Sequence, residues 1–355
     1  MKRVYCIGQG LVTPVGSTVE EVLAAVREGR SGHIFNREGF QGHSFFEAIA
    51  TEAAKKALEG IEITPRTGLI LSTAKGNVEF IGQEDISLAL SARRIANALG
   101  ISTTPFVVSN ACISGIAALL QGVRAIRADE YDKVVVVGAE VQSEFIRSGF
   151  DCLKALSPEP CRPFDKDRQG LNLGEAAAAM VLSGEIPDQV GDDGLEVGDD
   201  MFELVAGAVR NDANHISGPS RTGEGCYKCL RYVLRYVNKE DIAFISVHGT
   251  ATPYNDEMES IALSRAGLSD VPVNALKGIF GHTLGTAGIL EAIVSMAAFD
   301  RGIVLPTKGF SQMGVSCPVN ISAQERPASG KAFIKLLSGF GGVNSAMIFR
   351  KGGEL

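Results

Sequence analysis

One cysteine stands where a strand is expected to turn into a helix, a position suited to nucleophilic chemistry. Cys112 follows Val107-Val108-Ser109-Asn110, which reads as the end of a buried strand and a turn, and it precedes an apolar helix that includes Gly115. Unpaired backbone N–H groups at a helix N-terminus favour a thiolate and can hold an oxyanion. A small buried core cysteine is the alternative interpretation.

Two histidines lie in Gly-rich segments of the second half of the chain. His248 comes directly after the apolar run 242–247 and opens a segment of small residues in which Thr250 and Thr252 offer hydroxyl groups. His282 lies between glycines just before an apolar helix, a position that core packing does not explain. For His248, a hydrogen-bonded structural histidine at a strand end is the alternative.

A carboxylate and an aromatic residue complete the set of residues that stand out from their surroundings. Glu291 lies inside an otherwise apolar helix, and a buried carboxylate needs a partner, for which Lys277 is the expected residue. Phe340 is the single aromatic residue of the Gly-rich turn Ser338-Gly339-Phe340-Gly341-Gly342. A plain hairpin is the alternative interpretation of that turn.

The elements expected to position these residues alternate between strand and helix in two series. The predicted strands cover 3–7, 67–73, 104–108, 133–137, 202–208, 242–247, 271–275, 331–337 and 346–350, and the predicted helices cover 19–28, 46–58, 87–99, 223–236, 256–266 and 286–299. Residues 8–16 are interpreted as a loop, and 175–182 is ambiguous between helix and strand. Because sites gather at the carboxyl ends of strands, two halves packed together would let Cys112 and His248 meet.

Composition excludes several classes of function. The chain has 355 residues and a net charge of −7 with no basic run, so a nucleic-acid partner is not expected. No apolar stretch approaches the roughly 18 residues of a membrane span, and we expect neither a membrane association nor a signal peptide. Seven scattered cysteines favour free thiols in a reducing cytoplasm.

Two local patterns are interpreted as structural rather than metal-binding. Cys226 and Cys229 form one C-x-x-C without a second pair, so we expect two helix cysteines and no zinc site. The acidic, Gly-rich segment 187–200 lacks the spacing of a calcium-binding EF-hand loop and is predicted to be a solvated hairpin; its aspartates include Asp192, Asp193, Asp199 and Asp200.

Taken together, the motifs resemble those of the β-ketoacyl–acyl carrier protein synthases, in particular the elongating type with a Cys-His-His triad. The resemblance runs over nearly the whole chain and rests on the order and separation of Asn110-Ala111-Cys112, Arg162-Pro163-Phe164-Asp165 and its continuation to Gly170, Gly174-Glu175, His248-Gly249-Thr250-Ala251-Thr252-Pro253, Lys277 through His282, and Gly339-Phe340-Gly341-Gly342. It implies an α/β thiolase fold of two similar βαβαβαββ halves packed as α-β-α-β-α layers. Residues 1–183 would carry the nucleophilic cysteine and residues 201–355 both histidines.

The resemblance also implies a reaction, the decarboxylative Claisen condensation of an acyl thioester with a malonyl-acyl carrier protein to give a 3-oxoacyl-acyl carrier protein. Cys112 would take the acyl group, and His248 and His282 would stabilise the enolate formed when carbon dioxide leaves. Lys277, paired with Glu291, would hold the His282 loop. The substrates would be carried on the phosphopantetheine of a carrier protein, and no other cofactor or metal is implied.

Further residues are expected to bind substrate. Thr250 and Thr252 would hydrogen-bond the pantetheine arm, and Phe340 would act as a gate between the two half-reactions. The backbone N–H groups of Cys112 and Phe340 would form the oxyanion hole. Ile113 is bulkier than the small residue usual after the nucleophile and is expected to shape the acyl pocket.

Some features depart from the family or leave alternatives open. The region 30–100 is shorter than is usual in elongating synthases. The family's acyl-chain length and carrier-docking surface therefore cannot be transferred to this chain. We expect a homodimer; a heterodimer with a related subunit is the alternative, in which this chain could be a non-catalytic or chain-length-setting partner, although such partners lack the nucleophile. The starter-unit synthases carry Asn where His282 stands, and degradative thiolases use a second cysteine where Phe340 lies. Whether the pathway makes fatty acids, polyketides or aryl polyenes stays open.

Overall fold

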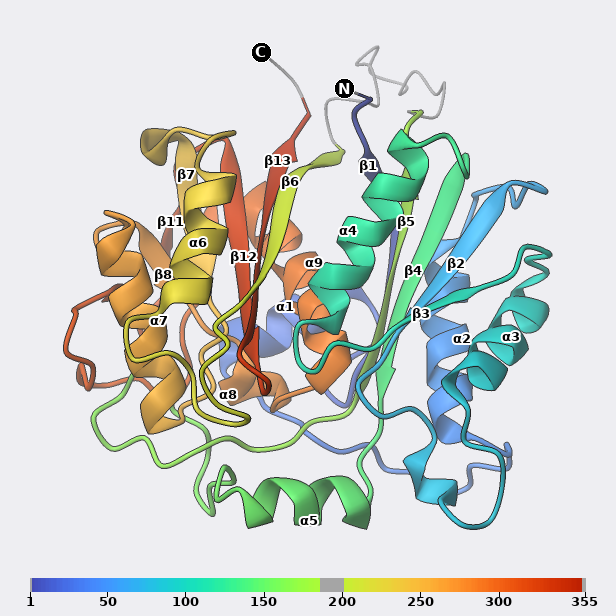
Figure 1. Ribbon diagram of the computed structural model, residues 1–355, viewed down its shortest axis with the longest axis horizontal. Coiled ribbons are helices and arrows are strands. Elements are labelled where there is room, and N and C mark those ends of the chain that lie inside the picture. The colour runs from blue at the N-terminus through green and yellow to red at the C-terminus, as the bar shows by residue number, and fades with distance from the viewer. Residues whose placement is uncertain (1, 186–200, 353–355) are drawn as a thin grey trace.

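The computed structural model describes residues 2–185 and 201–352, in which eleven strands form one sheet that divides into two halves (Figure 1). The predicted hairpin of 187–200 lies outside the described residues. The N-terminal half-sheet contains β1 (Tyr5–Val12), β2 (Thr67–Ser72), β3 (Phe106–Val108), β4 (Lys133–Glu140) and β5 (Ala176–Ser183) in the order β3-β2-β4-β5-β1. The C-terminal half-sheet contains β6 (Phe202–Asn211), β7 (Ile242–Ser246), β8 (Pro272–Asn274), β12 (Ala332–Gly339) and β13 (Val343–Lys351) in the order β8-β7-β12-β13-β6.

The two half-sheets therefore repeat one strand order, and they meet where β1 pairs with β6. Within the described residues, β1 and β6 pair at two positions, Tyr5 with Glu203 and Cys6 with Phe202, so the two half-sheets can diverge beyond them. Short strands complete the sheets: β10 (Asn320–Ile321) extends the C-terminal edge beside β8, and β9 (Ile303–Val304) pairs with β11 (Arg326–Pro327) separately.

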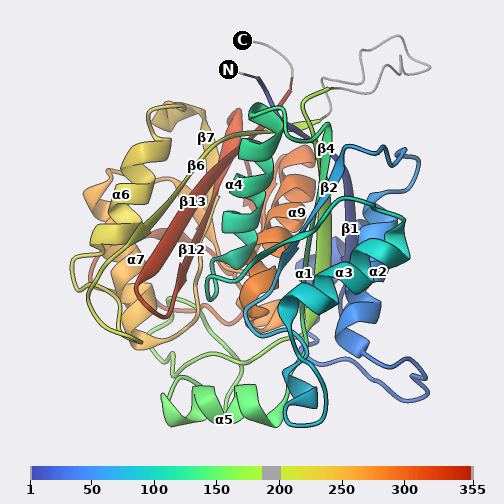
Figure 2. The same ribbon diagram turned by 45° about the vertical axis from the view of Figure 1, so that its right-hand side comes forward.

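Helices form the other three layers (Figures 1 and 2). The outer helices of the N-terminal half are α2 (Phe45–Ala57) and α3 (Leu88–Leu99), and those of the C-terminal half are α6 (Glu224–Val233) and α7 (Pro253–Arg265). Between the half-sheets lie α4 (Ser114–Arg127) and α9 (Ala287–Asp300), with α1 (Val19–Glu28) packed against α9. This α-β-α-β-α arrangement confirms the predicted thiolase-type fold.

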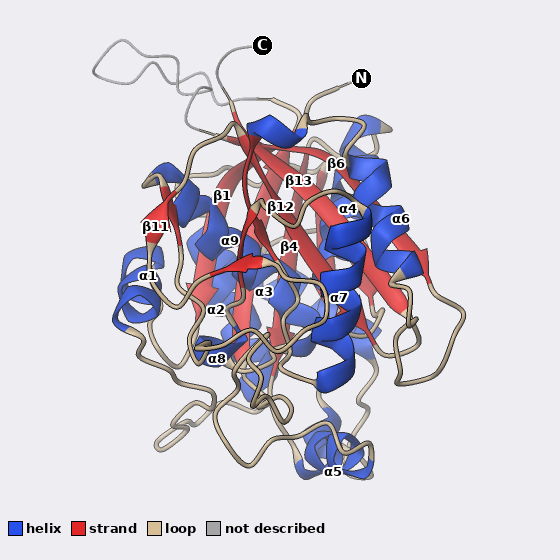
Figure 3. Cartoon of the chain, turned by 90° about the vertical axis from the view of Figure 1, so that its left-hand side faces the viewer, coloured by secondary structure: helices blue, strands red, loops and turns tan. Residues whose placement is uncertain are grey.

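The remaining helical elements are short. They are α5 (Glu144–Cys152), which lies at one end of the molecule away from the sheet (Figure 3), α8 (Lys277–Phe280), and the 3₁₀ turns Val78–Phe80, Lys239–Asp241 and Leu284–Thr286. No helix in the described part of the chain is long and apolar enough to cross a membrane.

The central helices pack closely because glycines face one another. A Cβ on Gly288 of α9 would lie 2.7 Å from the backbone nitrogen of Ile116, and one on Gly115 of α4 would lie 3.0 Å from the Cα of Gly288. Between two half-sheets, α9 has no solvent-facing side over most of its length, which explains its nearly unbroken apolar sequence and its burial from Ala287 to Ala298.

Two predictions of local structure are wrong or incomplete. The predicted loop 8–16 is wrong over its first five residues, because β1 continues through Gly8 and Gly10 and ends at Val12. The glycines are required there by α2: a Cβ on Gly10 would lie 2.1 Å from the carbonyl oxygen of Ala53. The ambiguous segment 175–182 forms the buried strand β5 between β1 and β4, since Ala side chains fit the tightly covered sheet. Helix α5 was not predicted.

Candidate active site

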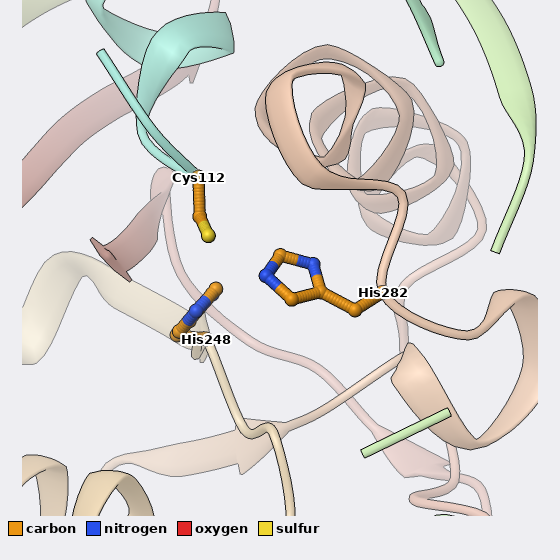
Figure 4. A group of neighbouring side chains, drawn as sticks. All are labelled: Cys112, His248 and His282. Atoms are coloured by element: carbon orange, nitrogen blue, oxygen red, sulfur yellow. The ribbon is translucent and has the colours of Figure 1, made fainter. Parts of the chain in front are cut away.

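Cys112, His248 and His282 meet at the boundary between the two halves of the molecule (Figure 4). Cys112 follows β3, His248 follows β7, and His282 follows α8. The sulfur and one nitrogen of each imidazole lie within 4.8 Å of one another, and all three side chains are buried. The two imidazole rings stand edge to face, with centroids 5.0 Å apart and planes 79° apart.

A strained turn places the cysteine at the start of α4. Ala111 adopts a left-handed conformation with φ of 47°, which is rare for a residue with a side chain. The hydroxyl of Ser114 stabilises the turn by accepting from the N–H of Asn110 at 2.8 Å and donating to the carbonyl of Ala111 at 2.6 Å. On the other side, a Cβ on Gly339 would lie 3.1 Å from the Cys112 nitrogen, so the β12–β13 turn approaches closely.

The expectation that the start of α4 favours a thiolate at Cys112 is wrong. Burial raises the pKa of the Cys112 thiol to about 11, although the nearby Lys277 ammonium and the N–H of Phe340 oppose that rise in pKa. Cys112 is only 6% exposed. The loss of hydration of a buried thiolate therefore outweighs the stabilisation by nearby positive groups.

Both histidines are electrically neutral at physiological pH. Burial, together with the charges of Lys277 and Lys335, lowers the pKa of His248 and of His282 well below the usual range. The Nδ1 of His282 accepts a hydrogen bond from the N–H of Leu284 at 3.3 Å, so its proton resides on Nε2. In Figure 4 the ring of His282 points toward Cys112 and His248, which makes Nε2 a donor into the site.

Two acidic residues of α7 hold the backbone of the His248 segment. Glu259 accepts the N–H groups of His248 and Gly249 at 2.7 and 2.8 Å, and Asp256 accepts that of Thr250 at 3.0 Å. Both carboxylates are fully buried. These two residues were not predicted, because acidic residues on a helix ordinarily face solvent; their place just after the His248 motif was the available signal.

Charged side chains behind the histidines form a buried cluster. The predicted ion pair is present, with Lys277 Nζ 2.8 Å from Glu291 Oε1, but Lys277 also donates to the carbonyl of His248 at 2.7 Å. The ion pair joins α8, which precedes His282, to α9, which follows it, and the same ammonium also contacts the His248 segment. Lys335 of β12 is a second partner, with Nζ 2.5 Å from Glu291 Oε2. This lysine was missed, although a lone lysine in an apolar strand was visible in the sequence.

A cavity of about 570 Å³ leads to the three buried side chains. Besides Cys112 and the histidines, its lining includes Thr250, Thr252 and Phe340. The hydroxyls of the threonines lie 2.9 Å apart, and the ring of Phe340 packs at 5.5 Å from that of Phe150 in α5.

Two other predicted positions lie away from the cavity. Ile113 is fully buried in the core and does not line it, because the start of α4 turns this side chain toward the central layer. Cys226 and Cys229 are buried along α6, as expected for helix cysteines, and the thiol of Cys229 donates to the carbonyl of Asn344.

Comparison of the sequence with family models gives two matches that follow one another. Residues 43–185 match "Beta-ketoacyl synthase, N-terminal domain", and residues 201–311 match "Beta-ketoacyl synthase, C-terminal domain". Curated relatives include 3-oxoacyl-[acyl-carrier-protein] synthase 2 of Vibrio cholerae, 29% identical, and synthase 1 of Escherichia coli K12, 26% identical, each aligned over 99% of both chains. The first alignment spans 419 positions against the 355 residues here, so that relative has residues without a counterpart in this chain.

Solved structures show the same relationship. A β-ketoacyl synthase from Burkholderia phymatum superimposes with a TM-score of 0.87 at 25% identity, covering 99% of this chain and 100% of that one. The ishigamide ketosynthase/chain length factor matches with a TM-score of 0.85 at 26% identity and the same coverage. Two adjoining domain matches, relatives aligned end to end and a shared fold lead to one conclusion: the chain belongs to the β-ketoacyl synthase family.

Proposed function

We propose that this protein is an acyltransferase that condenses a cysteine-bound acyl group with a malonyl-acyl carrier protein, with loss of carbon dioxide, to give a 3-oxoacyl-acyl carrier protein. The observation that carries the proposal is the cavity that ends at one thiol and two neutral imidazoles within 4.8 Å of one another. Thiol and imidazoles are the groups that the two half-reactions need.

In the first half-reaction, the sulfur of Cys112 attacks the carbonyl carbon of the acyl thioester. The thiol proton leaves through a neighbouring imidazole and reaches the departing carrier thiol, so an enzyme thioester and a free carrier thiol result. The N–H of Phe340, which faces the sulfur, would stabilise the oxyanion together with the N–H of Cys112. Thr250 and Thr252, whose hydroxyls line the cavity, would bind the pantetheine arm.

In the second half-reaction, the malonyl thioester loses carbon dioxide, and its electron pair becomes an enolate. His248 and His282 would donate hydrogen bonds to the thioester oxygen, which carries the developing negative charge. Neutral imidazoles suit this role, because an imidazolium would attract the departing carboxylate instead. The carbanion then attacks the acyl carbonyl on Cys112 and displaces the sulfur as a thiolate, which takes up one proton from water.

The same proposal extends to partners and location. The other candidate, a chain-length-setting subunit, is disfavoured because Cys112 and both histidines are present. We propose a homodimer formed at β3, the strand at the edge of the sheet, where Phe106 is 54% exposed; light scattering at micromolar concentration should give twice the chain mass. The carrier substrates and free thiols favour a cytoplasmic location, without a cofactor other than the carrier's phosphopantetheine.

Malonyl decarboxylation by histidine variants tests the proposed roles. His248→Ala or His282→Ala should lose about 2–4 kcal/mol of transition-state stabilisation, roughly 30- to 1000-fold in rate, while acylation of Cys112 suffers less. His43→Ala is the control, since His43 is exposed, pairs with Glu84 and does not line the cavity. Decarboxylation by either active-site variant at the wild-type rate would refute the scheme.

A further inference from the structure

Lys335 is a fully buried lysine that the proposed chemistry does not use. In β12 the side chains alternate: Ile334 and Leu336 pack toward α6 and α7, whereas Phe333 and Leu337 pack toward the central layer. Lys335 lies on the same face of β12 as Phe333 and Leu337, and its ammonium therefore points into the central layer, toward Glu291 of α9.

Four oxygen atoms surround this ammonium. Besides Glu291 Oε2 at 2.5 Å, Lys335 Nζ contacts the carbonyl of Val247 at 3.0 Å and both the carbonyl and the hydroxyl of Ser246 at 3.2 Å. Ser246 ends β7 and pairs with Lys335 across the sheet, and Val247 directly precedes His248. The lysine therefore ties the backbone that leads into His248 to the helix that follows the His282 loop.

The charge of the cluster does not balance. Glu291 is the carboxylate shared by two ammonium groups, those of Lys277 and Lys335, so the three side chains together carry one net positive charge when all are ionised. Burying an uncompensated charge costs several kcal/mol, and an apolar residue would suit this strand better if stability alone were selected. The excess charge adjoins the His248 segment, since Lys277 donates to the carbonyl of His248 at 2.7 Å.

We propose that Lys335 is a positioning residue for the condensation: its ammonium is a tethered internal cation that fixes the approach to His248 and keeps His248 and His282 uncharged. The inference rests on the proposed function, because it matters only if neutral histidines act as donors. A nearby cation disfavours imidazolium, and Lys335 contributes to the lowered pKa of both rings, after burial, Lys277 and, for His248, also His282.

The groups that face Lys335 come from three helices and the histidine segment. Burial and, to a smaller extent, the ammonium of Lys277 in α8 lower the pKa of Lys335 to about 8, although Glu291 of α9 and Glu259 of α7 oppose that shift in pKa. The internal cation should therefore lose its proton in mildly alkaline solution, which offers a second way to remove the charge without a substitution.

Carbon-13 NMR of labelled histidine in the full-length protein tests this directly. In Lys335→Met, the titrations of His248 and His282 should move upward by about one pH unit or more relative to wild type. The signals can be assigned with His248→Gln and His282→Gln. The matched control is Lys331→Met, which removes a lysine that is 73% exposed, just before the same strand, and should move neither titration.

The wild-type protein provides a second measurement should Lys335→Met fail to fold. Loss of the Lys335 proton near pH 8 should then appear as a second step in the chemical shifts of both histidines. Unchanged histidine titrations in folded Lys335→Met would overturn the proposal, as would the absence of the alkaline step in wild type if the variant does not fold. Because these titrations need no substrate, their outcome is independent of the condensation assay.

Discussion

At Cys112, burial of the thiol outweighs the positive groups around it, and this determines how the residue should react. A pKa of about 11 leaves the sulfur protonated between pH 7 and 9. The thiol proton must therefore leave while the sulfur attacks the acyl carbonyl. A nearby imidazole would accept that proton, so the histidines would act in the first half-reaction as well as in the second.

Alkylation of Cys112 should therefore depend steeply on pH. Because only the thiolate reacts, the rate of modification by iodoacetamide should rise about tenfold per pH unit from pH 7 to 9. Mass spectrometry of the Cys112 peptide gives the rate, with the exposed Cys152 as an internal reference. A rate that does not change over this range would mean that the resting site already holds a thiolate.

Phe340 is expected to gate the cavity. Its half-buried ring packs on Phe150, and it precedes two glycines with φ of 85° and 74°, a backbone that other residues rarely adopt. Phe340→Ala should slow condensation by roughly tenfold with little change in melting temperature, since the ring is not part of the deep core.

Comparison of two rates separates a gate from simple packing. If the ring gates carrier substrates, Phe340→Ala should leave alkylation of Cys112 by a small reagent unchanged or faster. Gly341→Val should slow turnover more than alkylation, because a Cβ at Gly341 meets no atom within 4 Å and strains only the backbone. Parallel losses in both rates would identify Phe340 as packing.

At the scale of elements, the crossing of α4 and α9 fixes the distance between the nucleophile and His282. Cys112 leads into α4, and the His282 loop leads into α9, so the glycine contact between these helices brings the two halves of the site together. Spacing of the catalytic groups should thus be sensitive to a single methyl group at this contact.

Gly288→Ala should test that spacing. The added Cβ would meet the Ile116 nitrogen at 2.7 Å, so the helices must separate; we expect a stability loss of about 1–3 kcal/mol and a larger relative loss of condensation, roughly 10- to 100-fold. Gly149→Ala in α5 is the control, since its Cβ meets nothing within 4 Å and Ala favours the helix. Equal activity in the two variants would contradict the prediction.

For the whole molecule, buried ionisable groups should make stability depend on pH. Glu140 at the end of β4 accepts hydrogen bonds from Thr73 and from the N–H groups of Ala74 and Gly285, all at Oε1. Burial nonetheless raises its pKa to about 7. A carboxyl whose folded pKa is raised stabilises the fold fully below its unfolded pKa of about 4.5, and that contribution is lost as the pH rises to about 7.

Glu140→Gln should remove this dependence. Its amide oxygen can keep the contacts made at Oε1, and the shift corresponds to a change of about 3 kcal/mol in the free energy of unfolding. Between pH 4 and 8, wild type should lose about that much stability relative to the variant, as measured by urea unfolding at both pH values. A difference between the two proteins that does not vary with pH would show that Glu140 keeps an ordinary pKa.

Local residue patterns determined much of the fold and of the candidate site. Most strands and helices were predictable from their apolar periodicity; α1, for example, has the predicted bounds 19–28 and is capped by Thr18 and Gly29. The pairing of Lys277 with Glu291 followed from the energetic cost of an isolated carboxylate in an apolar helix. The order and spacing of the motifs around Cys112, His248 and His282 indicated the family.

Contacts between distant segments decided the rest. The length of β1 depends on α2, because this helix packs so closely on the strand that only glycine fits at positions 8 and 10. The segment that was expected to be a loop is therefore a strand. The raised pKa of Cys112 depends on burial by elements 100 or more residues away, and the role of Lys335 depends on groups presented by the neighbouring strand β7. Such effects depend on desolvation and on the direction of side chains in three dimensions, which linear spacing does not specify.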